Sequence, residues 1–293
     1  MSVFAVSVFV ESIGFGLVTA AVLALAAVGF TLQFAVSGVL NLAYGGVMII
    51  AAYAAYEVNQ RGVNVWVSAL AGIAAGALVS VLLNRVIYTP FQRRGTSPIG
   101  MVIVSLGMTL ILVFGTQGAA GPTNVSYTMS QGATLTAGSI VLTVAQVAII
   151  GLSIVVMLGV HALIRYTRLG KAMRATAANR NLARNCGIRT DRVVALTWAI
   201  TGGLCGLAGV VFAINAGTFA ATDTDLFLVL ILAAVFLGGP GEPYGAMLGA
   251  LVIGLATEVS ASIILSDYKD VVAFVILLLM LAVRPTGLLG ARA

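Results

Sequence analysis

The sequence predicts an all-α protein, a polytopic transmembrane helical bundle of about eight or nine spans that includes discontinuous helices. Of its 293 residues, 60% are hydrophobic and 8% are charged, whereas a soluble domain carries about 25% charged residues. No Asp, Glu, Lys or Arg occurs in residues 12–56, 62–84, 95–164 or 193–222, and each stretch exceeds the roughly 20 residues that a spanning helix needs. Glycines spread through these runs, without the alternation typical of a membrane barrel, favour helices. We expect one transmembrane domain over residues 1–293.

Polar breaks divide the apolar sequence into nine candidate spans. They lie near residues 12–32, 36–58, 66–88, 98–118, 140–164, 193–215, 226–241, 243–265 and 271–288. The segments 226–241 and 271–288 each contain only a short run of strongly apolar residues, which is typical of half-helices that border a transport path. The other interpretation is an ordinary tilted helix whose end charges reach the membrane interface. For 271–288 the half-helix and the tilted helix are equally supported.

The basic residues predict the orientation. All Lys and Arg except Arg61 and Lys269 lie in 85–97, in 165–192 or in the C-terminal tail. Because cytosolic loops carry an excess of Lys and Arg, we expect the N-terminus outside and the C-terminus in the cytosol. The polar, uncharged loop 119–139 is then external and available to an outside partner.

The cytosolic segment 165–192 has the pattern of a short basic helix. Arg168, Lys171 and Arg174 recur every three residues, and Arg180 and Arg184 are four apart, among good helix formers. We expect Gly187 to end this helix in a left-handed conformation, and Thr190 with Asp191 to cap the next span. Periodicity alone leaves two interpretations open, a docking surface and a solvated loop that fixes orientation.

Small and polar residues inside the spans suggest where helices touch or where a path runs. Asn41 beside Gly45 and Gly46 favours a path-lining position. Three glycine pairs with four-residue spacing instead predict close helix packing: Gly72/Gly76, Gly202/Gly206 and Gly245/Gly249. Glu258 is the one acid predicted well inside a span, and we expect it to be neutral or hydrogen-bonded there rather than coupled to an ion gradient.

Four blocks of sequence resemble one known family. They are Gly38–Gly46, Thr167–Thr176 with Cys186–Val193, Leu237–Gly249, and Tyr268–Asp270 with Arg284–Gly290. In order and spacing they are similar to the permeases of branched-chain amino acid ABC importers, which are multi-pass proteins of the bacterial inner membrane. The resemblance covers nearly the whole chain.

The candidate site residues form two groups. The resemblance implies the ATPase-coupling group, and the polar, glycine and acidic residues inside the spans suggest the translocation path. The ATPase-coupling group is Arg168, Lys171, Arg174, Arg180, Arg184, Gly187 and Asp191. The translocation-path group is Asn41, Tyr44, Gly45, Gly46, Gly238, Gly239 and Glu258. The family often has His or Gln in place of Tyr44 and an acid in place of Gly46, so urea, short amides or other amino acids stay open as substrates.

The same resemblance implies the partners. They are a second, homologous permease as the other half of a heterodimer, two cytosolic ABC ATPase subunits, an extracytoplasmic substrate-binding protein and membrane lipid, with no nucleic acid. The chain lacks a GxxxxGK[ST] phosphate loop, so we expect ATP to be used by the partner subunits, with no cofactor or metal on this chain. Hydrolase and metalloprotease motifs are also missing from the sequence, and we expect no enzyme activity. A stand-alone carrier that uses Glu258 is the alternative.

Overall fold

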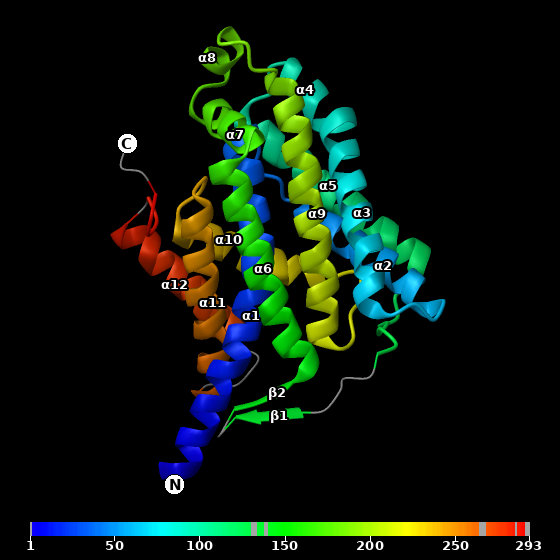
Figure 1. Cartoon of the computed structure of the whole chain (residues 1–293), viewed down its shortest axis with the longest axis vertical. Helices are drawn as coiled ribbons and strands as arrows, with labels where there is room; N and C mark the ends of the chain where they lie inside the picture. The colour runs from blue at the N-terminus through cyan, green and yellow to red at the C-terminus, as the bar shows by residue number, and fades with distance from the viewer. Residues whose placement is uncertain (1, 130–133, 138–139, 264–267, 285, 291–293) are drawn as a thin grey trace. The chain divides into compact units, whose positions relative to one another are not determined.

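The computed structural model describes residues 2–129, 134–137, 140–263, 268–284 and 286–290 (Figure 1). Contacts divide the chain into two compact units. Unit 1 contains Met1–Val28, Met129–Val155 and Val229–Ala293, and unit 2 contains Gly29–Thr128 and Val156–Leu228. Three helices contribute residues to both units: α1 (Ser2–Ser37), α6 (Val144–Tyr166) and α10 (Asp223–Gly238).

The other elements belong to one unit each. Unit 2 holds α2 (Tyr44–Gln60), α3 (Val65–Leu83), the π-helix η1 (Asn84–Tyr88), α4 (Thr89–Arg93), α5 (Pro98–Ala120), α7 (Arg168–Ala178), α8 (Arg180–Asn185) and α9 (Thr190–Ala216). Unit 1 holds β1 (Thr134–Ala137), β2 (Ile140–Thr143), α11 (Pro243–Ile263) and α12 (Lys269–Val283). Each of the nine predicted spans therefore contains an apolar helix.

Six helices of the described residues are long and apolar enough to cross a membrane. They are Phe9–Ser37, Val65–Arg93, Pro98–Ala120, Val144–Tyr166, Thr190–Ala216 and Pro243–Ser262. The apolar helices α2, α10 and α12 have 17, 16 and 15 residues. At about 1.5 Å per residue they reach roughly 22–26 Å, less than the ~30 Å hydrocarbon core. This length is consistent with the prediction that 226–241 and 271–288 contain short helices.

Three segments differ from the sequence-based expectation. The helix predicted for 36–58 begins only at Tyr44, because Gly38 adopts φ +67° at the end of α1 and the chain to Ala43 is not helical. The sequence predicts a loop up to residue 139 and a helix that begins at residue 140. Instead β1 and β2 pair antiparallel, with Thr134 opposite Thr143, since β-branched residues favour extended backbone. The helix expected to run to 288 stops at Val283, two residues before a proline.

Helices α2, α3 and α9 pack closely in unit 2, and glycines allow the close approach (Figure 1). A Cβ on Gly76 of α3 would overlap the Gly202 carbonyl of α9, and a Cβ on Gly206 would overlap the Gly72 carbonyl. In unit 1, Gly249 lies equally close to the Ala234 carbonyl. The packing role predicted for these glycines is confirmed, and it fits membrane helices, which associate through tight van der Waals contact.

The helix that contains α3 and α4 is continuous over Val65–Arg93 and includes one π turn, Asn84–Tyr88. The Thr89 amide donates to the Asn84 carbonyl, five residues back, in the turn before Pro90, which lacks an amide hydrogen. This turn buries Tyr88, whose hydroxyl donates to Asn41 Oδ1 at 2.6 Å. The Tyr88 ring also contacts Trp198 of α9 at 4.9 Å between ring centroids.

Loops predicted to be external lie together in unit 2. Val125 and Phe219 exchange backbone hydrogen bonds of 2.9 Å, and the Thr128 amide donates to Asn59 Oδ1 at 2.7 Å. The Tyr127 hydroxyl donates to the Ala52 carbonyl at 2.9 Å, and burial raises the pKa of this phenol. The three loops after α2, α5 and α9 therefore meet at one end of the unit, and they lie on the same side of the membrane in either orientation.

Candidate functional site

The predicted coupling segment, residues 165–192, folds as two helices rather than one. Asn179 leaves the helical conformation with φ −159° and ψ 105°, and its side chain caps α8 by accepting from the Leu182 amide at 2.9 Å. The Thr167 hydroxyl caps α7 in the same way, accepting from the Gly170 amide at 3.0 Å. Because Asn and Thr offer good N-cap oxygens, the segment can turn between its two basic clusters.

Helix α7 has a packed face and a basic exposed face. Gly170, Met173 and Thr176 are buried, whereas Arg168, Lys171 and Arg174 are exposed. A Cβ on Gly170 would overlap the carbonyl oxygens of Leu163 and Ile164, so only glycine fits this contact with the last turn of α6. The Arg174 guanidinium donates to the Ile164 carbonyl, where positive charge meets the negative end of the α6 dipole.

The turn from α8 to α9 is fixed by Gly187. Its φ is +85°, its amide donates to the Arg184 carbonyl, and the Ile188 amide donates to the Ala183 carbonyl, both at 3.0 Å. This pair of bonds is the Schellman motif, and the predicted left-handed end of the basic helix is confirmed.

The predicted cap of α9 by Thr190 and Asp191 is wrong. Arg189 occupies the cap position and no side chain bonds the free amides. The Asp191 carboxylate instead pairs with the guanidinium groups of Arg180 at 3.1 Å and Arg184 at 3.2 Å. Both guanidinium groups of α8 contact the same oxygen of the carboxylate, and these exposed ion pairs join α8 to the first turn of α9.

The exposed surface of this segment combines positive charge with one apolar side chain. Leu182 of α8 is 61% exposed, between Arg180 and Arg184 in the sequence. A cavity of about 440 Å³ lies at the turn from α8 to α9, and it is lined by Arg184, Gly187, Ile188, Arg189, Thr190, Asp191 and Arg192. Cys186 is exposed there, whereas Cys205 in α9 is buried. Arg180 and Arg184 are each two residues from Leu182 and so lie on another face of α8. The exposed leucine on this basic segment is a candidate contact for a protein partner. Sequence reasoning missed Leu182, because it counted the residue only as a helix former.

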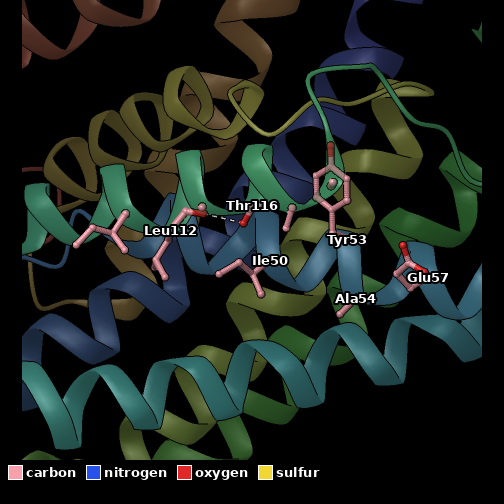
Figure 2. A pocket seen from close by; sticks show the side chains of 10 residues that line it. Ile50, Tyr53, Ala54, Glu57, Leu112 and Thr116 are labelled. Carbon is pink, nitrogen blue, oxygen red and sulfur yellow. Dashed lines mark hydrogen bonds between the residues drawn. The ribbon is translucent and has the colours of Figure 1, made fainter.

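A second cavity, the α2/α5 cleft, lies between these two helices of unit 2 (Figure 2). Its volume is about 510 Å³, and it is lined by Ile50, Tyr53, Ala54, Glu57, Ile111, Leu112, Gly115, Thr116, Ala119 and Ala120. The walls are mainly aliphatic, Glu57 supplies one carboxylate, and the Thr116 hydroxyl donates to the Leu112 carbonyl at 2.7 Å. Sequence reasoning took Glu57 only as an acid near a span end and did not predict the cleft.

The path residues predicted near the start of α2 are packed inside unit 2 and line neither cavity. Asn41 accepts from Tyr88, and the Tyr44 hydroxyl donates to the Thr201 carbonyl at 3.4 Å. Gly45 and Gly46 allow close contact with neighbouring chain. Their added Cβ atoms would lie 3.2 Å from the Thr224 carbonyl oxygen and 2.7 Å from Leu112 Cβ.

The path residues predicted in unit 1 also make packing contacts. Gly238 meets the Gly245 carbonyl of α11, and Gly239 has φ +109° in the turn that follows α10. Glu258 of α11 accepts from the Thr19 hydroxyl at 3.1 Å and pairs with Lys269 at 3.6 Å. The expectation of a hydrogen-bonded Glu258 is therefore confirmed. Within the described residues, no group of three His, Cys, Asp or Glu side chains is placed to hold a metal ion.

These features define the class of the molecule, a polytopic helical membrane protein. Residues 12–281 match the model of the family described as branched-chain amino acid transport system, permease component, so the chain belongs to that family. It is a multi-pass transport permease of the ABC class in the bacterial inner membrane, and six helices of its described residues are long and apolar enough to cross the bilayer.

Curated relatives cover nearly the whole chain. The high-affinity branched-chain amino acid permease proteins LivH of Escherichia coli K12 and BraD of Pseudomonas aeruginosa are 30% and 32% identical to it. The alignments cover 96% of both chains for LivH and 94% of both for BraD. The ribose import permease RbsC of Escherichia coli is 25% identical over 89% of this chain and 81% of its own.

A solved structure supports the fold. PsaBC from Streptococcus pneumoniae in complex with Fab matches with a TM-score of 0.53, covering 93% of this chain and 91% of that one. The sequences are 13% identical, so the likeness concerns the fold alone.

Proposed function

We propose that this chain is the permease subunit of an ATP-driven importer and forms the translocation path for branched-chain amino acids. The observation that carries the proposal is the surface of the coupling segment, residues 165–192, in a chain of this permease family. It presents Leu182 and the basic side chains on α7 and α8, and the pairs of Asp191 with Arg180 and Arg184 join α8 to the first turn of α9. Because of this link, a partner that displaces α8 would also displace the first turn of α9.

The proposed assembly contains a second, homologous permease, two cytosolic ATPase subunits and an external substrate-binding protein. ATP is used by the ATPases, and the whole chain acts as one permease domain without a cofactor. The coupling group, from Arg168 to Asp191, contacts an ATPase. The predicted path residues of both units are proposed to shape the helices around the path, since their glycines set how closely the helices approach.

The proposed substrate class rests on relatives. LivH and BraD, whose names specify branched-chain amino acids, align over nearly the full chain, whereas the sugar permease RbsC is less similar. The alternatives are urea or short amides carried by the same type of importer, and a stand-alone carrier that uses Glu258. The Thr19 and Lys269 contacts of Glu258 support a structural role for that carboxylate.

Co-purification and uptake test the function together. From the native host in mild detergent, the wild-type chain should bring down an ATPase, and the reconstituted complex should import leucine, isoleucine and valine only with ATP. Leu182→Asp should abolish ATPase co-purification because it places a negative charge at the apolar contact. Asn181→Asp adds the same charge on the same exposed helix, about 100° away, and should retain it. Uptake that persists without ATP, or preference for urea or ribose, would refute the proposal.

The proposed orientation has a direct test, since Cys186 is exposed on the coupling segment and Cys205 is buried. A membrane-impermeant maleimide should label Cys186 in inverted vesicles and leave it unlabelled in intact spheroplasts. Cys186→Ser is the control for labelling of Cys205. Labelling in intact spheroplasts would place the segment outside and overturn the orientation and the ATPase contact together.

A further inference from the structure

The α2/α5 cleft combines aliphatic walls with two unused polar groups. Glu57 is exposed and, among the described residues, has no hydrogen-bond or ion-pair partner, so its carboxylate is free to pair with a ligand cation. Tyr53 also lines the cleft and is 7% exposed, and its hydroxyl has no hydrogen-bond partner within the described part of the chain. A buried hydroxyl without a partner is unfavourable by about 1–3 kcal/mol, so a ligand that accepts from it would be stabilised.

The positions of these groups follow from the helix contact. Gly46 lets Leu112 of α5 approach the backbone of α2, and the cleft extends from Leu112 toward the C-terminal end of α2. Figure 2 shows Tyr53 and Glu57, one turn apart, rising from α2 on the side of α5. The carboxylate therefore lies near the end of the cleft where the predicted external loops meet.

We propose that the α2/α5 cleft binds a free amino acid with an aliphatic side chain on its way through the permease. The Glu57 carboxylate pairs with the substrate ammonium, and the Tyr53 hydroxyl donates to the substrate carboxylate. The side chain lies against Ile50, Ile111 and Leu112. The inference rests on the proposed function and adds a substrate site within this chain itself.

The chemistry of the lining favours this occupant over others. The cavity of about 510 Å³ falls in the size range of small-molecule pockets, about 300–1,000 Å³. A sugar would need several hydrogen-bonding side chains, but the Thr116 hydroxyl is already bonded to the Leu112 carbonyl. A phospholipid with an ammonium headgroup would pair with Glu57 in the same way, so lipid is the competing occupant that the experiment below distinguishes. One ion pair and one hydrogen bond give the weak binding that lets a transported solute leave.

Glycine 115 allows the cleft to be filled without disturbing the helices. A Cβ at Gly115 would meet nothing within 4 Å, and the residue lines the cleft. Gly118 lies one turn further along α5, is equally open, and is not among the lining residues. Gly115→Val and Gly118→Val therefore make the same chemical change on the same helix, and only the first occupies the cleft.

The test uses the complete transporter, with its ATPase subunits and binding protein, in proteoliposomes. Gly115→Val should lower ATP-driven leucine uptake at least tenfold, whereas Gly118→Val should stay within twofold of wild type. Equilibrium dialysis of the purified complex without binding protein should detect labelled leucine bound to wild type. Glu57→Gln should weaken that binding at least tenfold, and Tyr53→Phe should weaken it severalfold. All variants should retain the wild-type unfolding temperature and ATPase content.

The outcomes separate this inference from the proposed function. If wild type imports leucine and both Gly115→Val and Glu57→Gln import it equally well, the cleft is not a substrate site. The same conclusion holds if native mass spectrometry finds a phospholipid that Gly115→Val displaces while leucine uptake is unchanged. If wild type itself imports no branched-chain amino acid, the proposed function fails first.

Discussion

Replacing Gly206 by alanine tests whether the α3–α9 contact is as close as the structure places it. The added Cβ would overlap the Gly72 carbonyl oxygen and lie 3.0 Å from the Gly72 carbonyl carbon and 3.2 Å from Ile73 Cα. All three atoms are backbone, so no side-chain rotation relieves the overlap and α3 itself must move. Overpacking of this kind destabilises by about 1–3 kcal/mol.

Gly203→Ala is the matched control on the same helix. Its Cβ would lie 3.4 Å from Ile73 Cγ2 and 3.9 Å from the Ile73 carbonyl oxygen, which is ordinary contact. Both substitutions gain about 1 kcal/mol of helix propensity, so this gain cancels when the two variants are compared. Gly206→Ala should therefore be less stable than Gly203→Ala by about 1–3 kcal/mol.

The comparison is made by thermal unfolding in detergent at a fixed scan rate, because membrane proteins often unfold irreversibly. At about 2–4 °C per kcal/mol, the unfolding temperature of Gly206→Ala should lie roughly 2–12 °C below that of Gly203→Ala. Equal unfolding temperatures for the two variants would refute the close helix contact and the role assigned to these glycines.

Three further substitutions probe other contacts. Tyr88→Phe removes the donor to Asn41 and should lower stability by about 0.6–2 kcal/mol, seen as a lower unfolding temperature with an unchanged KM for uptake; a changed KM would instead indicate a path-lining Asn41. Gly170→Ala forces α7 away from the end of α6, so ATPase co-purification should fall while the unfolding temperature changes little. Full co-purification would contradict the fixed placement of α7. Glu258→Gln keeps an acceptor for the Thr19 hydroxyl and loses a partly exposed ion pair worth up to about 1 kcal/mol, so ATP-driven uptake should persist; its loss in a stable protein would favour the carrier interpretation.

Hydropathy predicted the helical segments well because apolar length is a local property of the sequence. Each predicted span contains a helix, and the packing glycines were recognised by their spacing. The ends were harder to predict. Residues 140–143 have enough apolar character to join the span that follows, and only pairing with 134–137 makes them a strand. Hydropathy could not predict this strand, because the strand depends on a pairing partner that lies outside the span.

The coupling segment shows a similar division. The φ of Gly187 could be predicted because only glycine readily adopts a left-handed helix end. The partner of Asp191 could not, because a cap and an ion pair both suit an acid at the start of a helix. The choice depends on the turn at Asn179, which brings Arg180 and Arg184 to the carboxylate. Leu182 carried a usable signal, since it is an isolated apolar residue between two arginines.

The non-helical stretch before α2 explains why Asn41 could be interpreted in two ways. Irregular backbone within an apolar segment is tolerated only where protein or a wet cavity satisfies its polar groups. Here the Gln92 side chain donates to the Ser37 carbonyl at 3.1 Å and the Ser105 hydroxyl donates to the Leu40 carbonyl at 3.2 Å. The Tyr88 hydroxyl donates to Asn41 in the same region. Asparagine beside glycine suits a path lining equally well in sequence. The structure adds a hydrogen-bond donor on a π turn more than 40 residues away, which supports packing. The path-lining role of Asn41 stays a prediction, and the KM of Tyr88→Phe tests it.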